Sequence, residues 1–203
     1  MTPTPTPIPP QRRRRNRLLL LALFALFFGS LLLAGALRFS GWRPAASKNY
    51  GELLQPPGDL REVSPLLADG TGDYAWNPRA RIWRIALAPP SDCDDACDAL
   101  ARELDTVWRL LGRNADRVHV FWICPTTACA PPAGIMHNRA LRVLQYSAGL
   151  RAALPRNDEN TFGGRHGVPV YVIDPNGFVI LRYSPGFDPA GLRADMAKLL
   201  KLK

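Results

Sequence analysis

An uncharged apolar run, residues 18–37, constrains this chain more than any other feature. At ~1.5 Å per residue, a helix of this length covers the ~30 Å hydrocarbon core of a bilayer. Five arginines lie just before it, and basic residues favour the cytoplasmic side of a membrane. The sequence therefore predicts a single-pass helix in the inner (plasma) membrane, with a cytoplasmic N-terminus and a periplasmic or otherwise extracytoplasmic C-terminal domain.

A cleaved signal peptide is the alternative interpretation of this run. Ala34, Gly35 and Ala36 resemble the small residues of a cleavage site. The apolar run is, however, longer than the ~7–15 residues of a typical signal-peptide core. We therefore expect an anchor that stays attached to the protein and contacts membrane lipid.

Composition divides the chain into four expected parts. They are a disordered Pro-rich and Arg-rich cytoplasmic tail (1–17), the transmembrane anchor (18–37), a tether punctuated by proline (38–59) and one extracytoplasmic domain (60–203). The last part has the usual length of a single domain and is long enough to bury a core.

The formal net charge of +9 is uneven along the chain. Five of the 26 basic residues precede the apolar run and all 17 acidic residues follow it, which leaves 21 basic against 17 acidic residues. A domain with a charge near +4 and no basic stripe is unlike a nucleic-acid-binding surface. We therefore expect no nucleic acid among the partners.

The order of apolar patterns indicates the fold of the last part. Buried strands are predicted at 81–87, 118–123, 168–173 and 178–183, and helices at 92–111, 138–154 and from Asp188 onward. Asn176 and Gly177 provide the hairpin turn between the last two strands. This βαβ, α, ββ, α order predicts an α/β, thioredoxin-like fold, with a central mixed sheet flanked by helices.

Five side chains suited to soft metals are expected at one edge of this sheet. Cys93 and Cys97 follow the first parallel strand, Cys124 and Cys129 follow the second, and His166 precedes the antiparallel strand. Ligands gather where parallel strands end, and an antiparallel strand begins at the same edge. Thiolate and imidazole together suit copper or zinc better than oxygen-preferring ions.

The pair Cys93 and Cys97 leaves two chemistries open. Residues four apart share a helix face, so both sulfurs can reach one ion, with His166 as a third ligand. The same two thiols could instead form a disulfide. Nearby aspartates disfavour a thiolate of low pKa and attract a cation, whereas the helix N-terminus favours the thiolate. On balance the local charge favours a metal.

Cys124 and Cys129 form a second pair of unknown connectivity. They could close a disulfide that braces the loop at the end of the strand. They could also act as a second redox pair or add metal ligands, and sequence alone does not fix the pairing.

The residues around these positions resemble the Sco/SenC family of copper chaperones, which helps to assemble cytochrome c oxidase. The likeness covers roughly residues 60–203. It rests on Cys93 and Cys97, on His166, and on the strand and turn from Val170 to Gly177. The resemblance implies copper as the bound metal, held by Cys93, Cys97 and His166. It also implies an oxidase subunit or another copper protein as the partner.

Two other functions fit the sequence as well. A periplasmic thiol–disulfide oxidoreductase would use Cys93 and Cys97 as its catalytic residues and needs a thiol of low pKa. A redox-inert interaction module of an oxidase complex would have kept the fold without its chemistry. We expect a metallochaperone rather than an enzyme, with the thiol–disulfide oxidoreductase as the enzymatic alternative.

Overall fold

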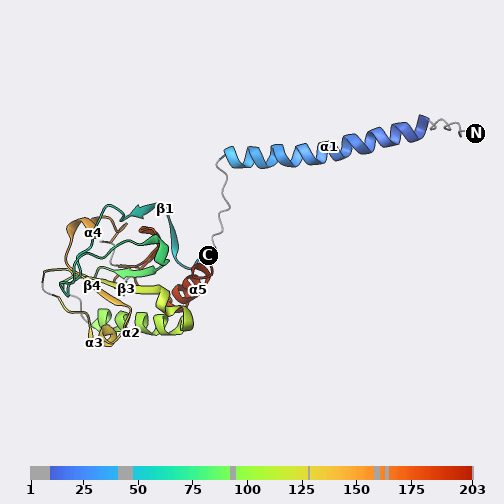
Figure 1. The fold of residues 1–203 in the computed structure, drawn as a ribbon. Helices are drawn as coiled ribbons and strands as arrows, with labels where there is room; N and C mark the ends of the chain where they lie inside the picture. Colours follow the sequence, from blue (N-terminus) through green and yellow to red (C-terminus); the bar gives the residue numbers. More distant parts are fainter. Residues whose placement is uncertain are drawn as a thin grey trace, which may run out of the picture. The chain divides into compact units, whose positions relative to one another are not determined.

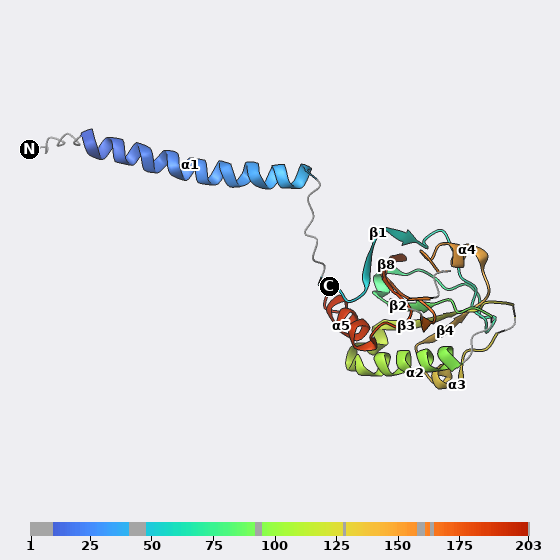
Figure 2. The same cartoon turned by 180° about the vertical axis from the view of Figure 1, so that it is seen from behind.

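The computed structural model of the chain describes residues 10–40, 48–91, 95–127, 129–157, 161–162 and 165–202. For residues 10–13, 161–162 and 165–166 it describes the backbone alone. The chain divides into two compact units, Met1–Ser47 and Lys48–Lys203. Figures 1 and 2 show their elements from opposite sides.

The first unit contains one long helix, α1 (Pro10–Phe39). Its segment Arg14–Phe39 is long and apolar enough to cross a membrane, and none of its most apolar part is buried in the protein. Residues 10–17 also lie within α1, so the predicted disordered tail was wrong for this stretch. Proline is favoured in the first helical turn, and arginine is a good helix former. Residues 1–9 lie outside the described residues.

A six-stranded mixed sheet forms the centre of the second unit, in the order β1-β8-β7-β2-β3-β4. The strands β2, β3 and β4 are parallel, whereas β7, β8 and β1 add to β2 in antiparallel pairs. Their bounds are β1 (Glu52–Asp59), β2 (Trp83–Leu87), β3 (Val118–Ile123), β4 (Leu141–Leu144), β7 (Val170–Ile173) and β8 (Phe178–Tyr183). A separate two-stranded sheet pairs β5 (Thr161–Phe162) with β6 (Arg165–His166).

Helices cover the two faces of this sheet, as the ribbons in Figures 1 and 2 show. On one face lie α2 (Asp95–Leu110), α3 (Ala133–Met136) and α5 (Pro189–Leu199). On the other face lies the short α4 (Ala148–Ala152). The 3-10 turns Pro78–Ala80 and Gly112–Arg117 complete the described elements.

Alternation along the strands produces two separate cores. In β3, Val120 and Trp122 pack toward α2, whereas Phe121 and Ile123 pack toward α4. Successive side chains of a strand point to opposite faces, so an apolar strand covered on both sides is buried throughout. This explains why every residue of β2 is buried.

Most predicted elements of the domain are confirmed. The strand β3 and the strand β8 have the predicted bounds, and β2, β7 and α2 differ by a few residues at their ends. Asp188 caps α5 by accepting a hydrogen bond from the backbone N–H of Ala190, and Pro189 opens the helix. An acceptor at this position satisfies one of the free N–H groups at a helix start.

The helix predicted over residues 138–154 is wrong. This stretch instead contains β4, which pairs in parallel with β3, followed by the five-residue α4. The spacing of Leu141, Leu144 and Leu150 suggested one face of a helix. In the structure, Leu141 and Leu144 are the first and last residues of β4. Leu144 and Leu150 are both buried in the core beneath α4. The buried backbone N–H and C=O groups of β3 need hydrogen-bond partners, and β4 supplies them. This requirement outweighs the helical spacing of the leucines.

The predicted tether extends too far along the chain. Residues 52–59 form β1, which pairs with β8 and shifts register between Leu53 and Gly58. Pro56 and Pro57 lie in this strand and lack the backbone N–H of a regular ladder, so they suggested a linker. Proline is tolerated in β1 because β1 is an edge strand with a bulge.

Candidate functional site

A cavity of about 320 Å³ lies where the parallel strands β2 and β3 end. Cys97 and Asp98 from the first turn of α2 line it, together with Cys129 from the loop after β3. Trp122 of β3 also lines it and is almost fully buried. Topology thus brings described members of both cysteine pairs to one cavity, at the sheet edge where ligands collect in α/β folds.

The loop before α2 forms one wall of this cavity. Pro89, Pro90 and Ser91 line it directly after β2. Proline lacks a backbone N–H and fixes φ, so Pro89 and Pro90 end the strand and give the wall a rigid backbone. The guanidinium of Arg151 supports the wall by donating a 3.0 Å hydrogen bond to the carbonyl oxygen of Pro89.

Cys97 is 3% exposed and is disulfide-bonded, and no cysteine in the described ranges is free. Its position in the first turn of α2 places the sulfur near the positive end of the helix dipole, which favours a thiolate after reduction. The same turn carries Asp95 and Asp98, whose carboxylates oppose that effect and favour a bound cation. The first turn of α2 therefore carries the sulfur of Cys97 together with two carboxylates, those of Asp95 and Asp98.

Cys124 and Cys129 are joined by a disulfide, with Cα atoms 5.7 Å apart. Cys124 directly follows β3 and is 3% exposed, whereas Cys129 is half-buried. Pro125 and Thr126 lie between them and line the same cavity as Cys97. The disulfide therefore closes the loop that forms the second wall of the cavity.

The other two predicted ligands are described less fully. Cys93 lies outside the described residues. The backbone of His166 forms β6, where it pairs with Thr161, and its side chain is not described. The next residues, Gly167 and Val168, line a cavity together with Ala96, the neighbour of Cys97 in α2. The chain thus passes beside the first turn of α2 immediately after His166.

The part of the chain that the structure describes contains no cluster of three or more His, Cys, Asp or Glu side chains close enough to hold a metal. Of the predicted trio, only the Cys97 side chain belongs to that part. The ligand set Cys93, Cys97 and His166 therefore stays a prediction.

Trp122 lines the cavity and Arg151 supports its wall through Pro89, and the sequence revealed neither role. Arg151 was placed on a long helix that does not form, and nothing in its sequence context points to a bond with Pro89. Burial lowers the pKa of Arg151, and the nearby hydroxyls of Tyr146 and Tyr171 act in the opposite direction. Trp122 belongs to the core cluster beneath α2 and also lines the cavity.

A polar cluster on the opposite face of the sheet accounts for His119. The Nδ1 atom of His119 lies 2.8 Å from the hydroxyl of Tyr74, and Nε of Arg84 donates a 3.0 Å hydrogen bond to the same hydroxyl. Arg84 is 1% exposed and also contacts the ring of Trp76, with 4.9 Å from Cζ to the ring centroid. The aromatic rings and the carbonyl oxygen of Asp174 stabilise this buried cation.

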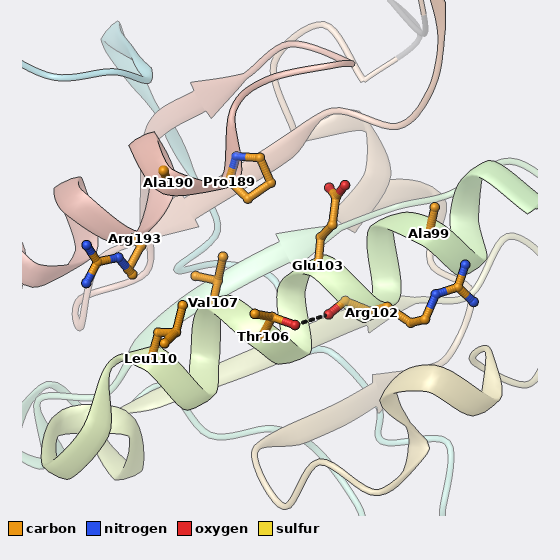
Figure 3. A pocket seen from close by; sticks show the side chains of 9 residues that line it. All are labelled: Ala99, Arg102, Glu103, Thr106, Val107, Leu110, Pro189, Ala190 and Arg193. Carbon is orange, nitrogen blue, oxygen red and sulfur yellow. Dashed lines mark hydrogen bonds between the residues drawn. The ribbon is translucent and has the colours of Figure 1, made fainter.

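A further cavity of about 410 Å³ lies between α2 and the start of α5 (Figure 3). Figure 3 shows Arg102 and Arg193 at its two ends and Glu103 and Val107 along α2 between them. Its lining contains no cysteine or histidine. This cavity therefore lacks the thiol and imidazole groups of the site expected from the sequence.

Comparison with known proteins supports the predicted fold. Residues 83–203 match the family model described as "Transmembrane-like, thioredoxin-like, C-terminal domain". No curated protein matches the sequence. The family match and the mixed sheet flanked by helices confirm the predicted thioredoxin-like fold.

Among solved structures, the fold is similar to that of apo Sco1 from Thermus thermophilus, with 18% identity and a TM-score of 0.53, over 79% of this chain and 100% of that one. A SCO1/SenC family lipoprotein from Bacillus anthracis str. Ames has 17% identity and a TM-score of 0.53, over 73% and 99%. Yeast Sco1, solved with copper bound, has 14% identity and a TM-score of 0.51, over 78% and 96%. The predicted resemblance to Sco/SenC proteins is thus confirmed in the fold, at low sequence identity.

Proposed function

The chain belongs to the family of transmembrane-like, thioredoxin-like C-terminal domains, and from this membership we propose that it is a membrane-anchored, copper-binding and thiol-redox assembly factor for a respiratory oxidase. Residues 18–37 anchor it in the inner membrane, and the C-terminal domain works on the periplasmic side. The arginines before the apolar run support this orientation.

One observation carries the proposal. The sulfur-bearing Cys97 lines the cavity at the end of β2 and β3, next to the carboxylate-bearing Asp98. A soft sulfur donor beside a negatively charged carboxylate suits Cu(I) or Cu(II) better than it suits an anion or a metal ion that prefers oxygen ligands. Copper is the cargo here, held by the thiolates of Cys93 and Cys97 and by the imidazole of His166, and passed to an oxidase subunit or another copper protein.

Support for His166 as the third ligand comes from its neighbours. Gly167 and Val168 share a cavity with Ala96, Ala99 and Leu100 of α2, so the backbone just after His166 lies against the helix that carries Cys97. Yeast Sco1, whose fold is similar, was solved with copper bound. The Sco/SenC resemblance of the sequence assigns the ligand role to this histidine.

Copper titration of the full chain in detergent tests the proposal. The protein is reduced, the reductant is removed without oxygen, and Cu(I) is added against a chromophoric competitor. We expect about one copper per chain, and loss of that copper in C93S, C97S and H166A. The matched control is H137A, because His137 is an exposed histidine after α3. Equal binding by wild type and H166A would defeat the ligand assignment, and no binding by wild type would defeat the function.

A thiol–disulfide oxidoreductase is the second candidate, favoured by the finding that Cys97 is disulfide-bonded. The two functions respond in opposite ways to Asp98→Asn, which removes a negative charge beside Cys97. Copper binding should weaken in this variant. Disulfide exchange should accelerate in it, because the pKa of a thiol falls when a neighbouring anion is removed. Turnover of a disulfide peptide by the wild type, faster in D98N, would support the oxidoreductase.

A further inference from the structure

The loop that carries Cys129 lies between two cavities. One is the cavity of Cys97, about 320 Å³ in volume. The other, of about 490 Å³, is lined by Cys129, by Leu67 from the segment between β1 and β2, and by residues before and along β4, among them Met136 and Arg142. Cys129 thus contributes to both, whereas its disulfide partner Cys124 lines neither.

Burial distinguishes the two sulfurs of this disulfide. Cys124 is 3% exposed and belongs to the same core cluster as Cys97, whereas Cys129 is half-buried and packs against that cluster from outside. Thiol–disulfide exchange requires a thiolate to reach a sulfur directly. Cys129 is the less buried half of this disulfide, and it lines the same cavity as Cys97, whereas Cys124 does not.

We propose that the Cys124–Cys129 disulfide is a redox relay, which passes electrons from a dithiol-bearing protein partner at the second cavity to the disulfide of Cys97. The inference rests on the proposed function, because copper binding requires Cys97 as a thiolate. It gives the second cysteine pair a role beyond bracing its loop.

The partner's dithiol reduces Cys124–Cys129 to two thiols and is itself oxidised to a disulfide. The Cys129 thiolate then attacks the Sγ atom of Cys97, which forms a Cys97–Cys129 bond and releases the former partner of Cys97 as a thiol. The Cys124 thiolate attacks Cys129, which restores Cys124–Cys129 and releases Cys97 as a thiol. Two electrons and two protons move from the partner to the disulfide of Cys97.

The order of reduction tests the relay in the oxidised full chain in detergent. Reduced thioredoxin is the probe, and thiols are alkylated at intervals and identified by mass spectrometry. We expect Cys124 and Cys129 to react before Cys97. In C124S/C129S the thiol of Cys97 should appear at least tenfold more slowly, whereas T127A, an exposed change in the same loop, should match wild type. An unchanged rate in the double variant would overturn the relay.

Trapping gives an independent test. The variant C124S cannot resolve the intermediate, so a peptide with the Cys97–Cys129 bond should accumulate. The matched variant C129S keeps only Cys124, which lines neither cavity, and should give no such bond to Cys97. Absence of the cross-link in C124S, or an equal cross-link in C129S, would contradict the assignment of Cys129.

Copper capacity separates this inference from the function on which it rests. Chemically reduced C124S/C129S should still bind about one copper per chain, because the relay acts before metal binding. Loss of copper in this variant would make Cys124 and Cys129 ligands and overturn the relay. Normal relay kinetics in a wild type that binds no copper would support the relay and reject the copper function.

Discussion

The imidazole of His119 is half-buried beside Tyr74, on the face of the sheet that carries α4. Burial lowers its pKa to about 4, and the positive charges of Arg142 and Arg84 act in the same direction. Tyr74 bridges His119 and Arg84 through its hydroxyl, so protonation would place a second cation against Arg84. His119 is therefore neutral at neutral pH, as expected for a histidine that is part of the core.

This pKa predicts how stability depends on pH. The unfolded chain takes up a proton at His119 near pH 6.5 and the folded chain only near pH 4. The free energy of unfolding should therefore fall as the pH drops from about 6.5 to about 4, and this contribution should then level off. Urea denaturation across this range checks the slope, and H119Q should flatten it. An imidazole that titrates near pH 6.5 in the folded protein by NMR would contradict this account.

Among the elements, α5 is connected to the start of the folded domain through one buried carboxylate. Asp195 is 1% exposed and accepts hydrogen bonds from the backbone N–H groups of Tyr50 and Gly51, at 2.7 and 3.0 Å, and from the hydroxyl of Tyr183 at 2.8 Å. Lys198 adds a 3.0 Å ion pair. Burial raises the pKa of Asp195, but these hydrogen bonds outweigh it and the net pKa is lowered.

Asp195→Ala should destabilise the domain by about 3 kcal/mol, because it leaves two buried donors and one part-buried donor without their acceptor. The free energy of unfolding from urea titration measures this loss. Asp116→Ala is the control, since its ion pair with Arg139 is exposed on both sides and should be worth less than about 1 kcal/mol. The Asp195 contribution should also be lost as the pH falls below the ordinary aspartate pKa of 3.8. Equal losses in the two variants would refute the buried link.

The elements that sequence predicted correctly are those whose local pattern agrees with their tertiary setting. Apolar runs gave β3, β7 and β8, and Asn176 with Gly177 marked the hairpin, where Gly177 has a positive φ of 101°. The strands β1 and β4 were missed because they lie at the two edges of the sheet. Edge strands carry less of the apolar pattern, and their pairing depends on partners far away in the sequence.

At the scale of the whole molecule, the chain combines an apolar helix with a folded domain. Leu26 lies near the middle of α1 and is exposed. Leu26→Arg should disrupt membrane insertion, because a central arginine costs about 2.5–3.5 kcal/mol on insertion scales. Carbonate extraction of membranes should therefore release more of this variant than of wild type, with L26I as the control. Equal retention of L26R and wild type would contradict the anchor.

Topology also sets how far the candidate site could be foreseen. The convergence of Cys97 and Cys129 follows from the rule that parallel strands end at one edge, and the shared cavity agrees with it. The rule does not give the second cavity behind Cys129, because that cavity depends on β4 and on the loop at Leu67. Its shape arises from contacts between distant segments, which no local pattern encodes.

The hydrogen bonds to Asp195 have a mechanical consequence for a domain attached through its N-terminal side. Tension applied from the N-terminal side of the domain reaches Lys48, Tyr50 and Gly51 first, and their hydrogen bonds to Lys198 and Asp195 of α5 must break before force can act on β1. The edge strand β1 would otherwise peel from β8 one pair at a time. A single carboxylate in the last helix therefore protects the edge of the sheet against force applied at the N-terminal side of the domain.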